Sequence, residues 1–205
     1  MIAVLDYGIG NVRSVLNAFR HLGIEATLTR DPSSISTSQG LVIPGVGAFG
    51  EGMRRLDENK LIPVIKSAVS SGKPVLGICL GFQLLMRSST ELGEHNGLNF
   101  FPLGVKRLEV TERLPHIGWG GVYSDLTAKR HSRLLKGLDG ENFYFVHSFC
   151  VPYEPTPYVT ASTTYGEQKF LSSIELDNLF GVQFHPEKSG EKGLQLLMNF
   201  AEISI

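Results

Sequence analysis

A cysteine stands between two glycines in the segment GICLG, residues 77–81. The apolar run at residues 74–78 is typical of a buried strand, and the following segment FQLLM, residues 82–86, has helical spacing. A sharp strand-to-helix turn presents its central residue to a ligand, and the N–H groups that begin the helix lower the pKa of a thiol and bind a developing oxyanion. The pattern predicts that Cys79 is a nucleophile; a buried cysteine that only fills space is the alternative.

A nucleophilic thiol needs a general base, and His185 is the best placed of the six histidines. It ends the apolar, strand-like segment LFGVQFH, and Glu187 follows two residues later. In an extended chain, residues i and i+2 project to the same side, so the carboxylate would orient the imidazole and stabilise the imidazolium. Histidine and glutamate at this spacing also occur as ordinary surface neighbours. The pair indicates a catalytic base only in combination with the cysteine turn.

The glycine-rich segment VIPGVGAFGEGM, residues 42–53, predicts a loop at the end of another apolar strand. Gly45 and Gly47 would let backbone N–H groups approach a ligand closely. A phosphate-binding loop is excluded because no Gly-Lys-Ser/Thr follows. We expect this loop to provide an oxyanion donor beside the N–H of Leu80, with a plain connection between strand and helix as the alternative.

The elements that must position these residues alternate in the first half of the chain. Strands are expected at residues 2–6, 25–30, 40–45 and 74–78, and helices at residues 11–23 and 61–72. Beyond Glu91, strand-like segments follow one another at residues 104–110, 120–126, 142–149, 158–165 and 179–185. An amphipathic helix is expected at residues 190–203.

This order of elements predicts an α/β fold with a mostly parallel central sheet, flanked by helices and continued by an antiparallel extension. The sequence contains no internal repeat, low-complexity tract or linker-like segment, so a single domain over residues 1–205 is expected.

Charge and cysteine content exclude several classes of partner. The chain has 19 basic and 20 acidic side chains and a net charge of −1, which favours neither nucleic acid nor an acidic membrane surface. The two cysteines lack the paired spacing of a zinc site or disulfide framework. With no leader-like or membrane-spanning segment, we expect a cytoplasmic protein that acts without a metal or cofactor.

Three segments, PGVG, GICLGFQLL and GVQFHPEKS, resemble the motifs of class I glutamine amidotransferases. The segments PHIGW and HPEKS narrow this resemblance to the glutaminase subunits of imidazole glycerol phosphate synthase, and it extends over the whole chain. The resemblance implies hydrolysis of glutamine to glutamate and ammonia by a Cys-His-Glu triad. It assigns Cys79 as the nucleophile, His185 as the general base and acid, and Glu187 as the orienting carboxylate.

The resemblance also implies the residues that surround the triad. The oxyanion hole would be formed by the backbone of Leu80 and of Gly45, Val46 and Gly47. The glutamine substrate would be held at its α-amino and carboxylate ends by Gln83 and Glu91, with the backbone of His147, Ser148 and Phe149 completing the pocket.

A partner subunit is implied as well. The resemblance predicts a heterodimer with a (β/α)8-barrel cyclase, which receives ammonia through a channel and forms imidazole glycerol phosphate in histidine biosynthesis. Asn11, Trp119 and Lys188 would lie at this interface, although a helix cap, a core anchor and a solvated charge are their respective alternatives. Hydrolysis is expected to be slow until the partner docks, with the loop at residues 45–47 not yet arranged for an oxyanion.

Two places depart from the family pattern. The milder departure follows His147, where Ser148 and Phe149 stand and some relatives carry an aromatic hydroxyl. Gly120 follows Trp119 where the family usually has asparagine, which leaves open a paralogue that serves another acceptor, such as a sugar. A cysteine peptidase on a similar turn, or a catalytically silent scaffold, are the alternatives from other functional classes.

Overall fold

The computed structural model describes residues 1–125 and 132–205. Its centre is an eight-stranded sheet with the order β2-β1-β3-β4-β14-β13-β12-β9. The strands, in that order, are Ala26–Thr29, Ile2–Leu5, Gly40–Ile43, Val75–Ile78, Leu179–Val182, Gln168–Leu176, Val159–Tyr165 and Tyr123–Ser124.

Strand β14 joins two kinds of pairing. It runs parallel to β4, and β4, β3, β1 and β2 continue as a parallel sheet. On its other side β14 pairs antiparallel with β13, which pairs antiparallel with β12. The expected parallel sheet with an antiparallel extension is therefore confirmed.

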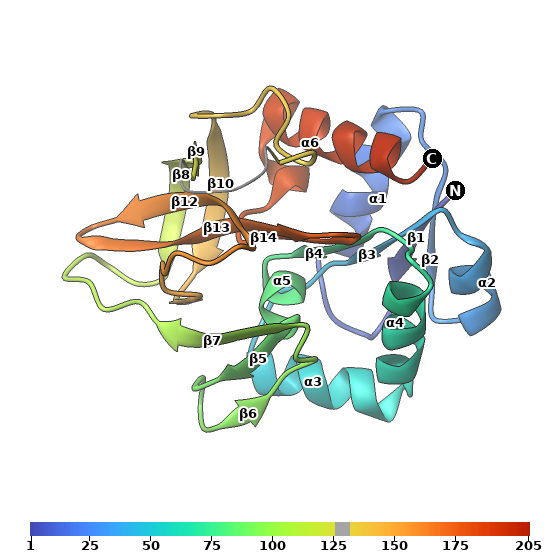
Figure 1. Ribbon diagram of the computed structural model, residues 1–205, viewed down its shortest axis with the longest axis horizontal. Helices are drawn as coiled ribbons and strands as arrows, with labels where there is room; N and C mark the ends of the chain where they lie inside the picture. The colour runs from blue at the N-terminus through green and yellow to red at the C-terminus, as the bar shows by residue number, and fades with distance from the viewer. Residues whose placement is uncertain (126–131) are drawn as a thin grey trace.

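Helices cover both faces of this sheet. They are α1 (Val12–His21), α2 (Pro32–Thr37), α3 (Phe49–Glu58), α4 (Leu61–Ser70), α5 (Leu80–Leu84) and α6 (Gly190–Ile203). In Figure 1 the sheet is seen nearly edge-on, with α1 and α6 above it and α3, α4 and α5 below. Alternate residues of β1 enter the two cores: Ala3 and Leu5 pack on one side, and Ile2 and Val4 on the other. Burial on both faces explains why these strands read as continuous apolar runs.

Two smaller sheets lie beside the central sheet in the part of the chain that the structure describes. The first pairs β8 (His116–Gly121) with β10 (Asn142–His147). The second has the order β11-β7-β5-β6, formed by Phe149–Cys150, Phe101–Arg107, Met86–Ser89 and His95–Asn96.

The structure corrects several sequence-based boundaries. The segment 42–53 is not a loop throughout, because α3 begins at Phe49. Glycines inside this helix allow close packing: a Cβ on Gly50 would lie 2.6 Å from the His95 ring, and one on Gly52 would lie 3.1 Å from Leu84. The helix after Cys79 ends at Leu84, because the chain then enters β5.

The later half holds further differences. Instead of one strand at residues 120–126, β8 ends at Gly121 and β9 covers Tyr123–Ser124, while residue 126 lies outside the described residues. Strand β13 was not predicted, and neither were β5, β6 and helix α2. The carboxylate of Asp31 caps α2 by accepting a hydrogen bond from the Ser34 N–H at 2.8 Å.

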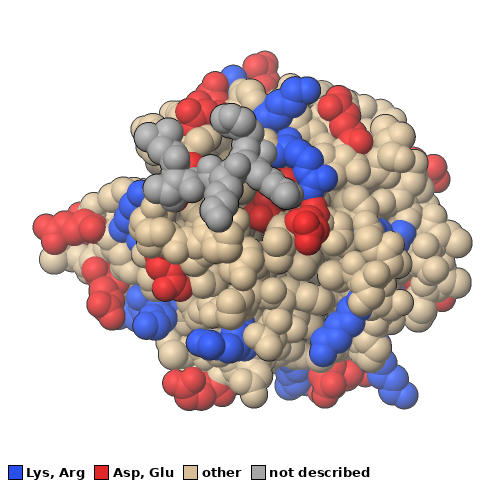
Figure 2. Space-filling model, viewed as in Figure 1, with Lys and Arg blue, Asp and Glu red and all other residues tan. Residues whose placement is uncertain are grey.

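Acidic and basic side chains are interspersed on the face shown in Figure 2, as expected for balanced charge. None of the helices in residues 1–125 and 132–205 is long and apolar enough to cross a membrane.

Candidate active site

Cys79 occupies a strained turn between β4 and α5. Its backbone has φ +52° and ψ −106°, a conformation that non-glycine residues rarely adopt. The flanking glycines are required by close contacts: a Cβ on Gly77 would lie 2.6 Å from the Gly81 carbonyl oxygen, and one on Gly81 would lie 1.8 Å from the Ile43 carbonyl oxygen. The sequence GICLG therefore folds as the predicted sharp turn, with Cys79 at its centre.

His185 and Glu187 meet just beyond the carboxyl end of β14, the strand beside β4. His185 Nδ1 lies 2.8 Å from Glu187 Oε1, and both side chains are almost completely buried. The pair does not form through extended chain, as the sequence predicted, because Pro186–Lys188 forms a 3-10 turn, η1. This turn, which begins at the proline, folds the carboxylate back onto the imidazole.

The charges of this cluster favour the imidazolium form of His185. Burial alone would lower the pKa of His185, but the negative charge of the nearby Cys79 sulfur and the Glu187 carboxylate outweigh burial and raise that pKa to about 10. His185 Nε2 makes no hydrogen bond of normal geometry to the residues that the structure describes. This nitrogen is therefore available for proton transfer at the sulfur.

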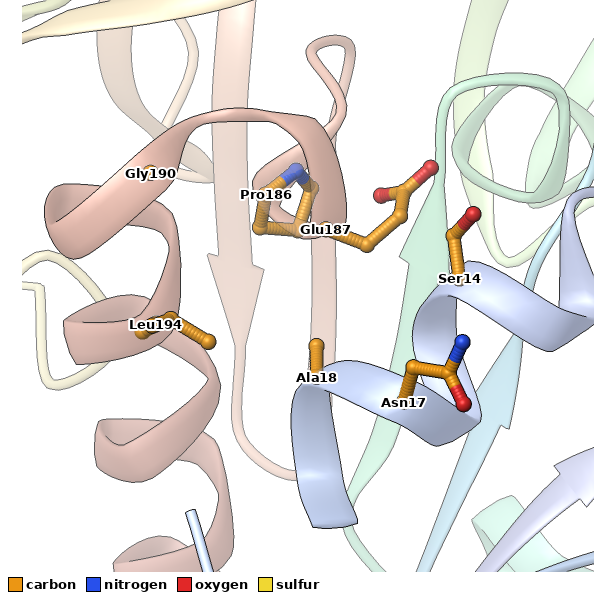
Figure 3. A pocket seen from close by; sticks show the side chains of 7 residues that line it. All are labelled: Ser14, Asn17, Ala18, Pro186, Glu187, Gly190 and Leu194. Atoms are coloured by element: carbon orange, nitrogen blue, oxygen red, sulfur yellow. The ribbon is translucent and has the colours of Figure 1, made fainter. Parts of the chain in front are cut away.

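The Glu187 carboxylate also contacts α1. Asn11 Nδ2 donates to Glu187 Oε1 at 3.3 Å, and Asn11 Oδ1 accepts from the Ser14 hydroxyl at 2.8 Å. Figure 3 shows the carboxylate extending toward the start of α1, where it lines a cavity of about 330 Å³ with Ser14 and Asn17. Asn11 stands at the start of α1, but its side chain caps no backbone N–H, so the helix-cap alternative is wrong for the side chain.

The glycine-rich loop at residues 44–48 lies against the cysteine turn. The Leu80 N–H is an expected oxyanion donor, but here it donates a hydrogen bond to the Gly45 carbonyl at 3.3 Å. The Tyr7 hydroxyl donates to the Pro44 carbonyl at 2.6 Å and leaves no space for a side chain at Gly45, whose Cβ would lie 2.5 Å away. In this loop conformation the Leu80 N–H is already occupied.

A cavity of about 520 Å³ opens beside Cys79. All the residues expected to hold a substrate line it, namely Gln83, Glu91, His147, Ser148 and Phe149. Val46, Gly47, Leu80 and Lys188 complete part of its wall. The structure thus brings together the predicted oxyanion and substrate residues around one thiol.

The polar groups in this wall are held by internal hydrogen bonds. Gln83 Nε2 donates to the Phe149 carbonyl at 2.8 Å and to Gln183 Oε1 at 2.9 Å, so both of its hydrogens are used. Glu91 Oε2 accepts from the Phe49 N–H at 2.8 Å, at the start of α3. A ligand in the cavity therefore meets two side chains that present acceptor oxygens.

Two buried histidines lie opposite each other on β8 and β10, and one of them, His147, lines the cavity. His147 Nδ1 lies 2.9 Å from the Phe149 carbonyl, and the His116 ring stacks on Tyr165 with 3.9 Å between ring centroids. Burial lowers the pKa of His116 to about 4. Burial and the neighbouring His116 and His185 lower the pKa of His147 to about 3. The hydrogen bond to the Phe149 carbonyl raises this pKa but does not offset them. Both rings are neutral at pH 7.

Of the predicted interface residues, Lys188 lines this cavity and Trp119 lies close to it through a shared neighbour, Tyr144, whereas Asn11 contacts Glu187 instead. Trp119 is 59% exposed, so its alternative as a core anchor is wrong. Its ring contacts Tyr144 edge-on at 6.1 Å, and Lys188 Nζ lies 5.8 Å from the same ring. Ile117, on the same face of β8, is 60% exposed.

The family described as glutamine amidotransferase class-I matches residues 3–203. The chain belongs to the class I glutamine amidotransferases.

Related amidotransferases match almost the full length of the chain. Imidazole glycerol phosphate synthase subunit HisH of Aquifex aeolicus (strain VF5) is 48% identical over 199 residues, covering 96% of this chain and 94% of that protein. The HisH subunit of Methanothermobacter thermautotrophicus is 45% identical over 204 residues, covering 99% of this chain and 98% of that protein. A crystal structure of a glutamine amidotransferase has a TM-score of 0.76, with 20% identity, 99% of this chain and 98% of that chain covered. This last likeness supports the amidotransferase fold alone.

Two residues of this amidotransferase site were missed by sequence reasoning. Tyr7 holds the glycine-rich loop, and no pattern in the sequence indicated that contact. Gln183 Nε2 donates to the Cys79 sulfur at 3.7 Å. A lone amide inside the apolar segment LFGVQFH was a usable signal, because a buried polar side chain needs a partner.

Proposed function

We propose that this chain hydrolyses glutamine to glutamate and ammonia, as the glutaminase subunit of an imidazole glycerol phosphate synthase in histidine biosynthesis. The observation that carries the glutaminase assignment is the strained Cys79 turn, which opens onto a substrate-sized cavity beside the buried His185–Glu187 pair. HisH subunits that are 42–48% identical over nearly the whole chain support the assignment to the synthase.

Cys79 acts as the nucleophile in this proposal. Its thiolate attacks the side-chain amide carbon of glutamine and forms a tetrahedral oxyanion. His185 gives a proton to the leaving nitrogen, so the C–N bond breaks and ammonia departs from a γ-glutamyl thioester. His185 then takes a proton from water, which attacks the thioester and releases glutamate and the free thiol. Glu187 keeps the imidazole oriented and stabilises its charged form.

The oxyanion would be bound by the Leu80 N–H together with the backbone of Gly45, Val46 and Gly47. Because Leu80 donates to the Gly45 carbonyl in this structure, the loop must rearrange before that N–H can bind an oxyanion. Docking of the partner would supply this rearrangement. Hydrolysis would then be slow when ammonia has no acceptor.

Substrate recognition follows from the groups that line the cavity. With both amide hydrogens of Gln83 used, its carbonyl oxygen is the group left for a ligand, and it suits the α-ammonium of glutamine. Glu91 adds a carboxylate on the same cavity. The backbone of residues 147–149 would complete the pocket around the α-carboxylate end.

The partner would be a cyclase subunit that docks over the cavity mouth and receives ammonia there. Support comes from the exposed Trp119 and Ile117 on β8 and from Lys188, which lines the cavity and approaches Tyr144. Asn11 would act at this edge through its hydrogen bond to Glu187. The proposal includes a cytoplasmic location, supported by the free thiols of Cys79 and Cys150.

Gly120 lies in a closely packed part of β8. A Cβ at this position would lie 3.2 Å from Phe145 and 3.3 Å from Thr163, closer than most Cβ contacts. A larger residue at this position would require the Phe145 and Thr163 side chains to shift by a few tenths of an ångström.

The test is glutamate release by the purified chain, alone and with a histidine-pathway cyclase and its ribonucleotide substrate. Strong stimulation by both together is expected, with no release by the Cys79→Ala variant and unchanged cyclase binding. Glutamate release that persists in Cys79→Ala would rule out the triad. If a glutamine-analogue electrophile labels the wild-type chain but the cyclase does not stimulate glutamate release, the triad assignment stands and the cyclase is not the partner. Partner-free cleavage of peptides would instead indicate a peptidase.

A further inference from the structure

Gln183 connects the Cys79 sulfur to the wall of the substrate cavity. Its side chain is completely buried, with Nε2 3.7 Å from Cys79 Sγ and Oε1 2.9 Å from Gln83 Nε2. Gln83 Nε2 also donates to the Phe149 carbonyl at 2.8 Å. A continuous series of hydrogen bonds therefore runs from the thiol through two amides to the cavity wall.

The backbone and the hydrogen bonds hold the Gln183 amide in one orientation. The Cys79 N–H donates to the Val182 carbonyl at 2.8 Å, and the Gln183 N–H donates to the Ser172 carbonyl at 3.0 Å. If the Gln183 amide flipped, its NH2 group would face the NH2 group of Gln83, and its oxygen would face the sulfur. Each amide therefore fixes the other.

We propose that Gln183 is a positioning residue that sets the orientation of the Cys79 thiolate and of the Gln83 side chain together. Its amide N–H stabilises the charged sulfur, because a hydrogen bond to the charged form favours ionisation. Its amide oxygen keeps Gln83 turned so that the Gln83 carbonyl faces the cavity. This inference rests on the proposed glutamine chemistry and adds a residue through which nucleophile and substrate pocket are coupled.

Several other titratable groups surround the sulfur. His185 and Tyr7 interact electrostatically with Cys79, while Glu91 and Lys188 line the same cavity. A substitution at Gln183 leaves these groups in place. A change in thiol reactivity can therefore be assigned to the amide.

The first test is the Gln183→Glu variant, which keeps an oxygen for Gln83 but places a carboxylate against the sulfur. The midpoint of the pH profile for iodoacetamide alkylation of Cys79 is expected to rise by about one pH unit, with a roughly tenfold slower reaction at pH 7. Burial raises the pKa of the Cys150 thiol to about 12, so Cys150 reacts little, and the Cys79→Ala variant measures any background.

The second test is the Gln183→Met variant, which has a similar length but no amide. Gln83 then loses one of its two acceptors, so a diazoketone analogue of glutamine should label Cys79 about tenfold less efficiently relative to iodoacetamide. The analogue concentration that gives half-maximal labelling should rise. A purely structural role for Gln183 would slow both reagents equally.

Asn199→Leu provides the matched control. Asn199 is also a buried amide, but it donates to the Leu134 and Lys136 carbonyls next to α6. Its loss should lower stability without moving the alkylation midpoint or the ratio of the two labelling rates. If the Gln183 variants behave like Asn199→Leu, the positioning role of Gln183 is wrong, but the proposal that the chain hydrolyses glutamine still stands. A wild-type chain that the diazoketone does not label at Cys79 would overturn both.

Discussion

His116 and His147 face each other on neighbouring strands, and His147 lines the cavity beside Cys79. Burial is the main reason that the pKa of His116 falls to about 4 and that of His147 to about 3. An unfolded histidine takes up a proton near pH 6.5. Because these two side chains stay neutral only while they are packed in the fold, the stability of this region depends on pH.

Stability is expected to fall as the pH is lowered from 6.5 toward 4, because the unfolded chain binds protons that the folded chain excludes. Each histidine contributes a slope of about 1.4 kcal/mol per pH unit in this window and almost nothing above it. The His116→Phe variant keeps an aromatic ring against Tyr165 and should remove one of the two contributions. Urea denaturation at pH 5 and pH 7 measures the difference; an equal pH dependence in wild type and His116→Phe would contradict it.

At the scale of elements, the cysteine turn is packed against its neighbours without spare space. The Cβ position on Gly81 lies 1.8 Å from the Ile43 carbonyl oxygen of β3, which belongs to the backbone and cannot rotate away. The strained conformation of Cys79 is thus maintained by the contact between α5 and the sheet.

The Gly81→Ala variant should lose about 3 kcal/mol or more of unfolding free energy, because α5 must move away from β3 to admit a methyl group. Gly104→Ala in β7 is the control, since its Cβ would lie 3.7 Å from Ser88 Oγ in ordinary contact. Urea denaturation of both variants gives the comparison. Equal unfolding midpoints would show that the turn is not constrained in this way.

Elements with a regular pattern could be predicted from the sequence, whereas elements set by packing could not. The helix at residues 190–203 was predicted with its observed bounds because its apolar residues recur at helical spacing. Helix α3 was missed because Gly50 and Gly52, poor helix formers, are placed by contacts with His95 and Leu84. The turn that pairs His185 with Glu187 was read as extended chain for a similar reason, since one short segment fits either geometry.

In the site, too, features with a local sequence pattern could be predicted and features set by packing could not. Cys79, His185 and Glu187 could be selected because their residue types and local sequences indicate chemistry. The state of the loop could not, because the hydrogen bond between Leu80 and Gly45 joins segments whose relative position only the fold defines. Nor could the contact of Tyr7 with Pro44 be read from either segment alone.

At the scale of the whole molecule, the central sheet unites the beginning and end of the sequence. Strand β14 pairs with β4 on one side and β13 on the other, so the parallel and antiparallel parts share one hydrogen-bonded sheet. Their cores lie on both faces of that sheet. This continuity supports the proposal that residues 1–205 form one domain.

One cooperative thermal transition is therefore expected for the isolated chain. Scanning calorimetry should give a calorimetric enthalpy equal to the van't Hoff enthalpy, since neither half of the sheet can unfold without exposing the other. Two separable transitions, or an enthalpy ratio well above one, would show that the antiparallel part is an independent unit.

The exposed Trp119 gives a prediction for the assembled enzyme. Trp119→Ala should weaken cyclase binding by about thirtyfold or more, the usual effect of losing a tryptophan anchor at an interface. Labelling of Cys79 by the diazoketone should stay unchanged. Ile205→Ala is the control, because Ile205 is 95% exposed at the carboxyl terminus, next to Ser204, which packs near the start of β3. Titration calorimetry measures both affinities; equal affinities would place the partner elsewhere.

The pairing of β4 with β14 also determines when the thiol can become competent during synthesis. Cys79 and Gln183 are 104 positions apart, and the segment after β14 that carries Gln183, His185 and Glu187 leaves the ribosome long after the cysteine. A nascent chain that stops before residue 179 contains Cys79 but lacks Gln183, His185 and Glu187. Unfinished chains therefore lack the general base that the proposed hydrolysis of glutamine requires.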